Sequence, residues 1–385
     1  MATNKEQNKL NVPHLRFPEF HGEWEKHRLS EYLDFKNGLN PDSKRFGKGI
    51  KFISVMDILN NPVITYDCIR ASVQATDAEI SSFSVENGDI LFQRSSETLE
   101  DVGRANVYID DKVAVFGGFV IRGKKKANYD PLFFRYLLSS PYARKRIIPM
   151  GAGAQHFNIG QEGLSKVSLN FPSIEEQAKI ASLLLLLDER IATQSKLIEK
   201  FESLIKGIRH DLFKDIQGEV LALSNIADIY QPQTISSSDL TTEGYWVYGA
   251  NGIIGKYKEY NHETEQICIT CRGNTCGTVN YTQPKVWITG NSMVINTDKY
   301  QRQVNKRFLF HYLSSYNFKS IVSGSGQPQI VRTPLEKIKV VLPAIYKQVR
   351  IANSIDIVSE KIDTESLVLR LLENQKQYLL RQMFI

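Results

Sequence analysis

Two short segments carry residue types that could do chemistry, and both fall short of the pattern that the chemistry requires. Residues 118–124 fit Gly-x-x-x-x-Gly-Lys, a loop that cradles phosphates, but Lys125 stands where Ser or Thr would hold magnesium. Asp130-Pro-Leu-Phe133 shares only its first two residues with the Asp-Pro-Pro-Tyr motif of amino-methyltransferases, and a helix that begins at Pro131 explains it better. We therefore expect neither a phosphate loop nor methyl transfer in this chain.

A group of thiols could in principle bind zinc. Cys268, Cys271 and Cys276 lie close together in the sequence, and His262 precedes them. However, Cys268 and Ile269 alternate as in a strand, and the chain has no second Cys-x-x-Cys pair. The other histidines are scattered, and no Ser/His/Asp order suggests a hydrolase. We interpret the thiols as buried or half-exposed, with no metal site, and predict that the chain is not itself an enzyme.

Composition allows a nucleic-acid partner without requiring one. The 385 residues leave room for two or three domains, and the net charge of 48 − 42 = +6 is mildly basic. Residues 1–10 are polar and do not resemble a signal peptide, and the longest aliphatic run, 183–187, is too short to span a membrane. With four cysteines, the expectation is a cytoplasmic protein with reduced thiols.

The chain contains a long internal repeat, because residues 167–213 reappear without a gap as residues 338–384. Any functional site of the chain must be positioned by this repeated framework. The register is fixed by identical pairs: Pro172/Pro343, Ile174/Ile345, Gln177/Gln348, Ile180/Ile351 and Ala181/Ala352. Each copy follows its own globular stretch, so a module is used twice. A two-fold pseudo-symmetric molecule is expected, and it suits a ligand with two half-sites.

Each copy of the repeat contains a helix of about 40 residues whose apolar positions step by four and three, as in a coiled coil. The first seam consists of Leu187, Ile191, Ile198, Phe201, Ile205, Ile208 and Leu212. The second consists of Val358, Ile362, Leu369, Leu372, Leu379 and Met383. Two matched seams in one chain most simply pair with each other. At about 1.5 Å per residue, each helix would be on the order of 60 Å long.

The chain is expected to divide into five segments: a tether (1–23), a first mixed domain (24–171), a first long helix (172–217), a second mixed domain (218–342) and a second long helix (343–385). The helical copies keep register, whereas the globular copies differ in length. A common frame with two unlike heads is typical of a protein that reads two different things a fixed distance apart.

Several motifs in this order resemble those of one family. They are the lead Pro13-His-Leu-Arg-Phe-Pro-Glu-Phe20 with Trp24, the two Pro-x-x-x-x-Gln-x-x-Ile-Ala segments, Ile53-Ser-Val-Met-Asp57, Tyr248-Gly-Ala-Asn-Gly-Ile-Ile-Gly255 and Gly324-Ser-Gly-Gln-Pro-Gln-Ile330. No single motif is specific, but their order and duplication over the whole chain resemble the specificity subunits of type I restriction–modification enzymes.

The resemblance implies an α+β fold, in which two mixed α/β target-recognition domains are separated by two long helices paired as an antiparallel coiled coil. Each domain would read one half of a split, asymmetric site in double-stranded DNA, and the helices would act as a ruler. Two modification subunits would dock and methylate adenine with S-adenosylmethionine, and up to two restriction subunits would cut unmodified DNA with ATP and magnesium. This chain would hold no cofactor and would be a non-catalytic DNA-reading subunit.

DNA readout needs Arg, Lys, Asn or Gln at base edges and further cations at phosphates. Polar loops recur at the same point of both modules, one with Gln155, His156 and Asn158 and one with Gln327 and Gln329. The further candidates lie on glycine turns or basic turns: Arg272, Asn274, Asn251, Lys256, Lys44, Arg45, Lys48, Arg122, Lys124, Lys125 and Lys126. Taken singly, each is better explained as a solvated charge or a turn residue than as a DNA contact. Because the polar loop recurs at the same point of both modules, the two loops are favoured as DNA contacts over the other candidates.

Two alternatives stay open. The chain could be the specificity partner of a fused methyltransferase–nuclease, which changes the partner and not the DNA-reading role. It could instead be a coiled-coil scaffold with two protein-binding heads. Binding through DNA phosphates weakens steeply with salt, whereas a hydrophobic protein interface does not.

Overall fold

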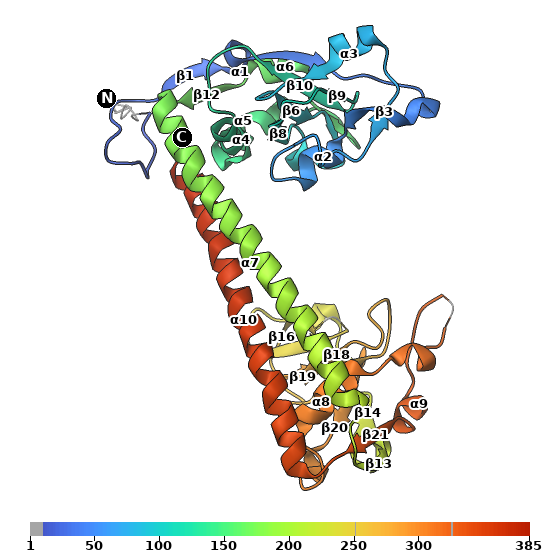
Figure 1. Cartoon of the computed structure of the whole chain (residues 1–385). Helices are drawn as coiled ribbons and strands as arrows, with labels where there is room; N and C mark the ends of the chain where they lie inside the picture. Colours follow the sequence, from blue (N-terminus) through green and yellow to red (C-terminus); the bar gives the residue numbers. More distant parts are fainter. Residues whose placement is uncertain (1–10, 251, 325) are drawn as a thin grey trace. The chain divides into compact units, whose positions relative to one another are not determined.

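The computed structural model describes residues 11–250, 252–324 and 326–385, and the chain divides into two compact units. Unit 1 comprises Met1–Ser195 and Val368–Ile385, and unit 2 comprises Lys196–Leu367. Each unit therefore contains part of both long helices, α7 (Ile174–Lys214) and α10 (Ile345–Gln382) (Figure 1). Within these ranges, no helix combines the length and hydropathy that a membrane span requires.

Unit 1 is built on two four-stranded sheets. The first is antiparallel, with order β2 (Leu33–Asn37), β10 (Val120–Lys125), β6 (Ile90–Gln93) and β8 (Ala105–Val107). The second has order β4 (Ser72–Val73), β3 (Phe46–Ile53), β9 (Ala114–Phe116) and β5 (Ser84–Val85), with β3 parallel to β9. Unit 1 also contains two antiparallel two-stranded ribbons: β1 (Glu25–Arg28) with β12 (Ser168–Phe171), and β7 (Ser95–Ser96) with β11 (Phe157–Asn158).

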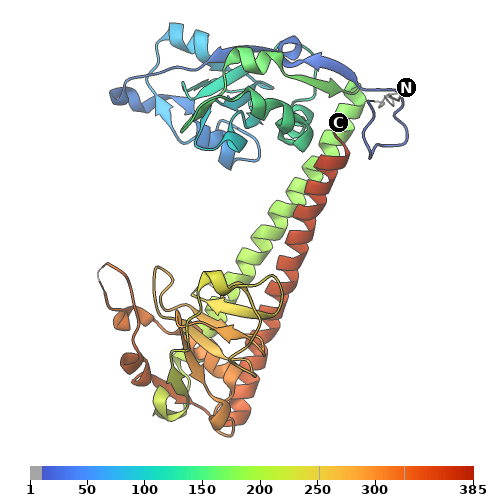
Figure 2. The same ribbon diagram turned by 180° about the vertical axis from the view of Figure 1, so that it is seen from behind.

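Short helices connect and cover these strands (Figure 2). They are α1 (Leu29–Tyr32), α2 (Val55–Asn60), α3 (Asp77–Phe83), α4 (Pro131–Ser139), α5 (Pro141–Ile147) and α6 (Gln161–Lys166), with 3-10 turns η1 (Ser43–Arg45), η2 (Leu99–Asp101) and η3 (Ile148–Met150). Helix α4 begins at a proline, as expected, and its N-cap residue Asp130 accepts a 2.8 Å hydrogen bond from the Phe133 N–H. Pro141 is the first residue of α5 and separates this helix from α4.

Unit 2 repeats the main sheet of unit 1. Its four antiparallel strands have the order β14 (Asp228–Tyr230), β20 (Ser292–Asn296), β17 (Ile267–Thr270) and β18 (Val279–Tyr281). A smaller sheet has the order β16 (Gly252–Tyr257), β15 (Tyr245–Gly249) and β19 (Trp287–Ile288), and β13 (Glu219–Ala222) pairs with β21 (Lys339–Leu342). The helices are α8 (Lys306–Ser315) and α9 (Arg332–Glu336), with turns η4 (Leu223–Asn225), η5 (Ser237–Asp239), η6 (Asp298–Tyr300) and η7 (Phe318–Ile321).

The central strand of each main sheet is buried on both faces. In β6, Ile90 and Phe92 enter the core shared with α4, while Leu91 faces the core of the second sheet. In β17, Ile267 and Ile269 face the core shared with α8, while Cys268 faces the smaller sheet. Successive side chains of a strand point to opposite faces, so a continuous apolar run here separates two cores.

The two long helices pack against each other in an antiparallel sense. In unit 1, Leu184 near the start of α7 lies in one core with Leu380 near the end of α10, and Asp188 forms a 2.5 Å ion pair with Lys376. In unit 2, Arg209 near the end of α7 and Asp356 near the start of α10 both bind His311, at 3.0 and 2.7 Å. The predictions of a paired frame and of two mixed domains are confirmed.

The seam positions differ in how much they are covered. Leu187, Ile205, Leu372, Leu379 and Met383 are buried. The half-buried positions are Ile191, Ile198, Phe201, Ile208, Val358, Ile362 and Leu369, and Leu212 is exposed. The seam is therefore closed most tightly where Leu187, Leu372, Leu379 and Met383 join the core of unit 1.

Candidate nucleic-acid interface

In unit 1, the polar loop at residues 151–158 is fastened to the end of the central strand. Ala152 and Asn158 exchange backbone hydrogen bonds of 2.9 and 2.8 Å, which closes the loop. Gly153 has φ +145°, and a Cβ there would lie 2.0 Å from the His156 carbonyl oxygen, so the close turn requires glycine. The exposed residues Gln155, His156 and Asn158 are thereby presented to solvent.

The strand on which this loop rests contributes a further polar residue. Just beyond β6, Ser95 pairs with Asn158 along the β7–β11 ribbon, and its hydroxyl donates a 2.5 Å hydrogen bond to the Asn158 Oδ1. The Ile159 N–H donates to the Arg94 carbonyl at 2.9 Å. We call Ser95, Gln155, His156 and Asn158 the polar edge of unit 1.

In unit 2, two separate polar segments of the sequence come together in the same way. Beyond β17, Arg272 forms a backbone bridge with Gln329, and the Gly273 N–H donates to the Pro328 carbonyl at 3.0 Å. Ser323 and Gln329 exchange two backbone hydrogen bonds of 2.8 Å, which closes the second loop. The exposed residues that result form the polar edge of unit 2: Arg272, Asn274, Gln327 and Gln329.

The two polar edges are equivalent in backbone and different in side chains. The Ile330 N–H donates to the Cys271 carbonyl at 3.0 Å, as the Ile159 N–H does to Arg94 in unit 1. Ser95 therefore corresponds to Arg272, and Asn158 to Gln329. Amide and guanidinium groups on such an edge can bond to base edges.

The basic turn of unit 1 lies before and within β3. Lys44 and Lys48 are exposed. Arg45 is half-buried because its guanidinium pairs with Glu79 and also donates to the Gln74 carbonyl at 2.8 Å. Two exposed lysines next to an anchored arginine suit phosphate contact better than base readout.

Arg122 is the one described candidate that lies inside its domain. It is 6% exposed in β10, its guanidinium donates to the Ser84 carbonyl, and it lies 5.4 Å from the centre of the Phe116 ring. The residue shares the strand face of Val120, and β5 covers that face. Its charge is used within the fold and is not presented to solvent.

The remaining basic candidates lie at the surface. Lys124 forms a 2.9 Å ion pair with Glu86, Lys125 donates to the Tyr129 carbonyl at 3.0 Å, and Lys126 is exposed. Lys256 in β16 places its ammonium 4.7 Å from the Trp246 ring centre. Asn251 lies outside the described residues.

Two residues next to the candidate contacts were not predicted from the sequence: Ser95 on the polar edge of unit 1, and the partly exposed Trp246 beside Lys256. The signal for Ser95 was available, because Ile90-Leu-Phe-Gln and Ile267-Cys-Ile-Thr are equivalent strands, and Ser95 follows the first as Arg272 follows the second. Trp246 carried no such signal, since a tryptophan in a strand is usually buried.

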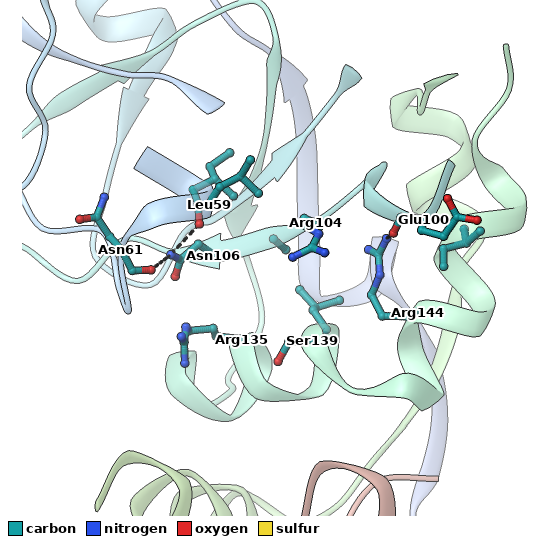
Figure 3. A pocket seen from close by; sticks show the side chains of 12 residues that line it. Leu59, Asn61, Glu100, Arg104, Asn106, Arg135, Ser139 and Arg144 are labelled. Carbon is teal, nitrogen blue, oxygen red and sulfur yellow. Dashed lines mark hydrogen bonds between the residues drawn. The ribbon is translucent and has the colours of Figure 1, made fainter. Parts of the chain in front are cut away.

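A separate cavity of about 350 Å³ in unit 1 is lined by Arg104, Arg135 and Arg144, with Asn106 and Glu100 among the other lining residues (Figure 3). Each arginine has a partner in the fold. Arg104 pairs with Asp101 at 2.5 Å and Arg135 with Asp188 at 3.5 Å, while Arg144 donates to the Glu100 and Val102 carbonyls at 2.8 and 2.7 Å. The cluster therefore braces α4 and α5 against their neighbours.

Two of the segments considered for catalysis and metal binding lie in or next to strands. Residues 118–124 lead into β10, which pairs with β2 and β6, whereas a phosphate loop opens a helix. Cys268 and Cys271 are buried, and burial raises the pKa of both thiols. Among the residues described, no three His, Cys, Asp or Glu side chains come together as metal ligands.

The similarity to known proteins covers both repeated modules of the chain. A family model described as "Type I restriction modification DNA specificity domain" matches residues 21–203 and again residues 217–374. A putative type I restriction enzyme MjaX specificity subunit from Methanocaldococcus jannaschii is 25% identical over 93% of the chain and 91% of the relative. The type I restriction enzyme EcoprrI specificity subunit from Escherichia coli is 28% identical over 39% of the chain and 37% of that relative.

Solved structures share the fold. The S subunit of a type I restriction–modification system from M. genitalium superposes with a TM-score of 0.63 at 18% identity, covering 97% of this chain and 99% of that one. A chain from work on complex assembly and conformational transition of the type I R-M system gives 0.56 at 14% identity, covering 93% and 96%.

Proposed function

The chain belongs to the family of the type I restriction modification DNA specificity domain, and we propose that it is the subunit that gives such a complex its DNA sequence specificity. Unit 1 and unit 2 would each read one half of a split site in double-stranded DNA. The observation that carries the proposal is the pair of polar edges, equivalent in backbone and unlike in side chains. Because the edges differ, the site would be asymmetric.

The two long helices would set the number of unread base pairs between the half-sites. Helix α7 runs without a break from unit 1 into unit 2, and α10 returns from unit 2 into unit 1. Half-site spacing follows the geometry of the protein frame in other DNA-binding proteins. A continuous pair of helices is a suitable ruler for this reason.

The same helices would dock partner subunits. Leu186 on α7 and Ile357 on α10 occupy the same repeat position and are 64% and 68% exposed. Exposed aliphatic residues at matched places suit two copies of one partner. We propose two modification subunits, which would bring S-adenosylmethionine, and up to two restriction subunits, which would use ATP and magnesium. The chain itself would have a non-catalytic role.

The test is to co-express the chain with the modification subunit of its operon and to map methylated adenines across the genome. A split, asymmetric motif that disappears when the chain is omitted is the expected result. A continuous or palindromic motif would contradict the proposal that the two units read two different half-sites.

A salt titration separates the proposal from the rival protein-binding scaffold. Binding of the complex to a duplex that carries the mapped motif should weaken linearly with the logarithm of salt concentration, because DNA phosphates release counterions. A flat salt response together with tight capture of another protein would favour the scaffold.

A further inference from the structure

Unit 1 carries an unusual aromatic residue at its surface. Phe119, in the turn between β9 and β10, is 70% exposed. It lines a hollow of about 470 Å³ together with Leu39, Pro41, Phe46, Phe52 and Met56. Phe46 and Met56 are also exposed. Contiguous exposed apolar side chains of this kind mark a binding surface.

This hollow adjoins the polar edge of unit 1. The Arg94 N–H donates to the Phe119 carbonyl at 2.9 Å, which places Phe119 beside the strand end that carries Ser95. Ser95 itself lines the hollow, and its hydroxyl binds Asn158. Met56 and Ser95 also border a neighbouring hollow that includes His156. A ligand on the polar edge therefore meets Phe119.

The charges around the hollow suit a polyanion. Lys44 and Arg45 precede Phe46, and Lys48 follows it, with both lysines exposed. Cations around an apolar centre suit a ligand that carries phosphates outside and an apolar group inside. In the major groove, that apolar group is the C5-methyl of thymine.

Unit 2 has a different residue at the same position. The Cys271 N–H donates to the Asn291 carbonyl at 3.0 Å, as the Arg94 N–H does to Phe119 in unit 1. Asn291 is exposed, and an asparagine amide typically reads adenine. One backbone position thus presents an apolar group in one unit and an amide in the other.

We infer that Phe119 is a specificity-determining residue that contacts the C5-methyl of a thymine in the half-site read by unit 1. The inference rests on the proposed function, since it requires unit 1 to bind a half-site.

The experiment uses the complex with the modification subunit and a duplex that carries the mapped site. The half-site of unit 1 is the one that the double variant Arg272→Ala/Asn274→Ala leaves intact. Each thymine in it is replaced in turn by deoxyuridine, which lacks only the methyl. At one of these thymines, the replacement should weaken DNA binding by the unaltered protein about fourfold, which corresponds to ~0.8 kcal/mol for one buried methyl. The same replacement should not change DNA binding by the Phe119→Ala variant.

Two further variants complete the design. Phe119→Leu retains an apolar group and should keep part of the methyl dependence. Val113→Ala removes another exposed apolar side chain of unit 1 that does not line the hollow, and it should behave like the unaltered protein.

Three outcomes would overturn the inference. The unaltered protein is insensitive to every deoxyuridine, or Phe119→Ala keeps the full sensitivity, or Phe119→Ala releases a protein subunit while the methyl dependence persists. The last outcome would make the hollow a protein-docking site. Failure of the proposed function looks different, because the unaltered complex would then show no split site before any variant is compared.

Discussion

Among single residues, two arginines illustrate how burial changes what a side chain can do. The guanidinium of Arg122 is buried against Ser84 and Phe116, where it stabilises the contact between two sheets. Arg272 is exposed on a glycine turn beside Gln329. The exposed guanidinium can form the bidentate bonds that read guanine, and the buried one cannot.

We expect Arg272→Ala together with Asn274→Ala to damage the reading of one half-site only. Each lost base contact is worth about 1–3 kcal/mol, so binding should fall at least tenfold and tolerate changes in that half. Arg302→Ala, an exposed arginine of the same unit, is the matched control. Methylation mapping checks the result, and equal loss at both half-sites would mark the two residues as structural.

Acid should destabilise the protein through two buried histidines. Burial lowers the pKa of His311 and of His262 from 6.5 to about 4, although Asp356 beside His311 acts in the opposite direction. Between these values the unfolded chain binds protons that the folded chain does not, so stability falls as pH falls from 6.5 to 4. The slope is about 1.4 kcal/mol per pH unit for each histidine.

Denaturant unfolding of the unaltered protein and of His311→Gln between pH 7 and pH 5 measures this effect. The variant should be less stable at pH 7 and should lose less stability on acidification. His210→Gln, at an exposed position on α7, should keep the slope of the unaltered protein. Equal slopes in all three proteins would show that His311 is not the titrating group.

At the scale of elements, the repeated Pro-x-x-x-x-Gln motif fastens each domain to its long helix. The buried Gln177 accepts from the Asp130 N–H at 3.1 Å and donates to the Pro172 carbonyl at 3.0 Å. Gln348 accepts from the Asn305 N–H at 2.8 Å and donates to the Pro343 carbonyl at 2.8 Å. Asp130 and Asn305 are the N-cap residues of α4 and α8, so one glutamine joins three elements.

Gln348→Ala should therefore cost about 2 kcal/mol or more, because it leaves buried backbone groups without partners. Gln377→Ala, at an exposed position of the same helix, should be nearly neutral. Chemical denaturation of both variants measures the difference. Similar losses in the two would mean that the glutamine hydrogen bonds contribute little.

At the scale of the whole molecule, the ruler proposal predicts how the spacer responds to helix length. Because the helices are antiparallel, an insertion in α7 needs a matching insertion in α10. Asp188 pairs with Lys376, and Arg209 and Asp356 both contact His311, so the residue that faces Lys200 lies near Thr364. Seven residues inserted after each add ~10 Å of helix, which is about three base pairs.

Methylation mapping of this double insertion should give a spacer longer by about three base pairs, with both half-sites unchanged. Insertion in α7 alone breaks the seam register and is the control, which we expect to lose activity. Altered half-sites with an unchanged spacer would show that the helices are not the ruler.

The docking proposal makes a prediction about stoichiometry. Leu186→Asp or Ile357→Asp alone should weaken one modification subunit about tenfold and leave the other bound, and the double variant should bind neither. Native mass spectrometry counts the bound subunits. Leu371→Asp is the control, because this exposed leucine corresponds to Lys200 in the other copy and so has no apolar counterpart. Two bound subunits in the double variant would contradict the proposal.

The repeat, the two long helices and the family resemblance can be recognised from the sequence alone. These follow from patterns that each segment carries locally, such as the heptad spacing from Leu187 to Leu212 and the matched Pro172 and Pro343. Helical periodicity requires no distant partner, and this explains why it could be read directly.

Which polar and apolar side chains reach the surface depends on how distant segments pack in the folded chain. The tertiary structure joins the Arg272 turn to the loop of Gln329, buries Arg122 and exposes Phe119. Each of these outcomes depends on strands that are distant in the sequence, because the exposure of a strand residue is set by what packs on its face. The composition of a segment cannot supply that information.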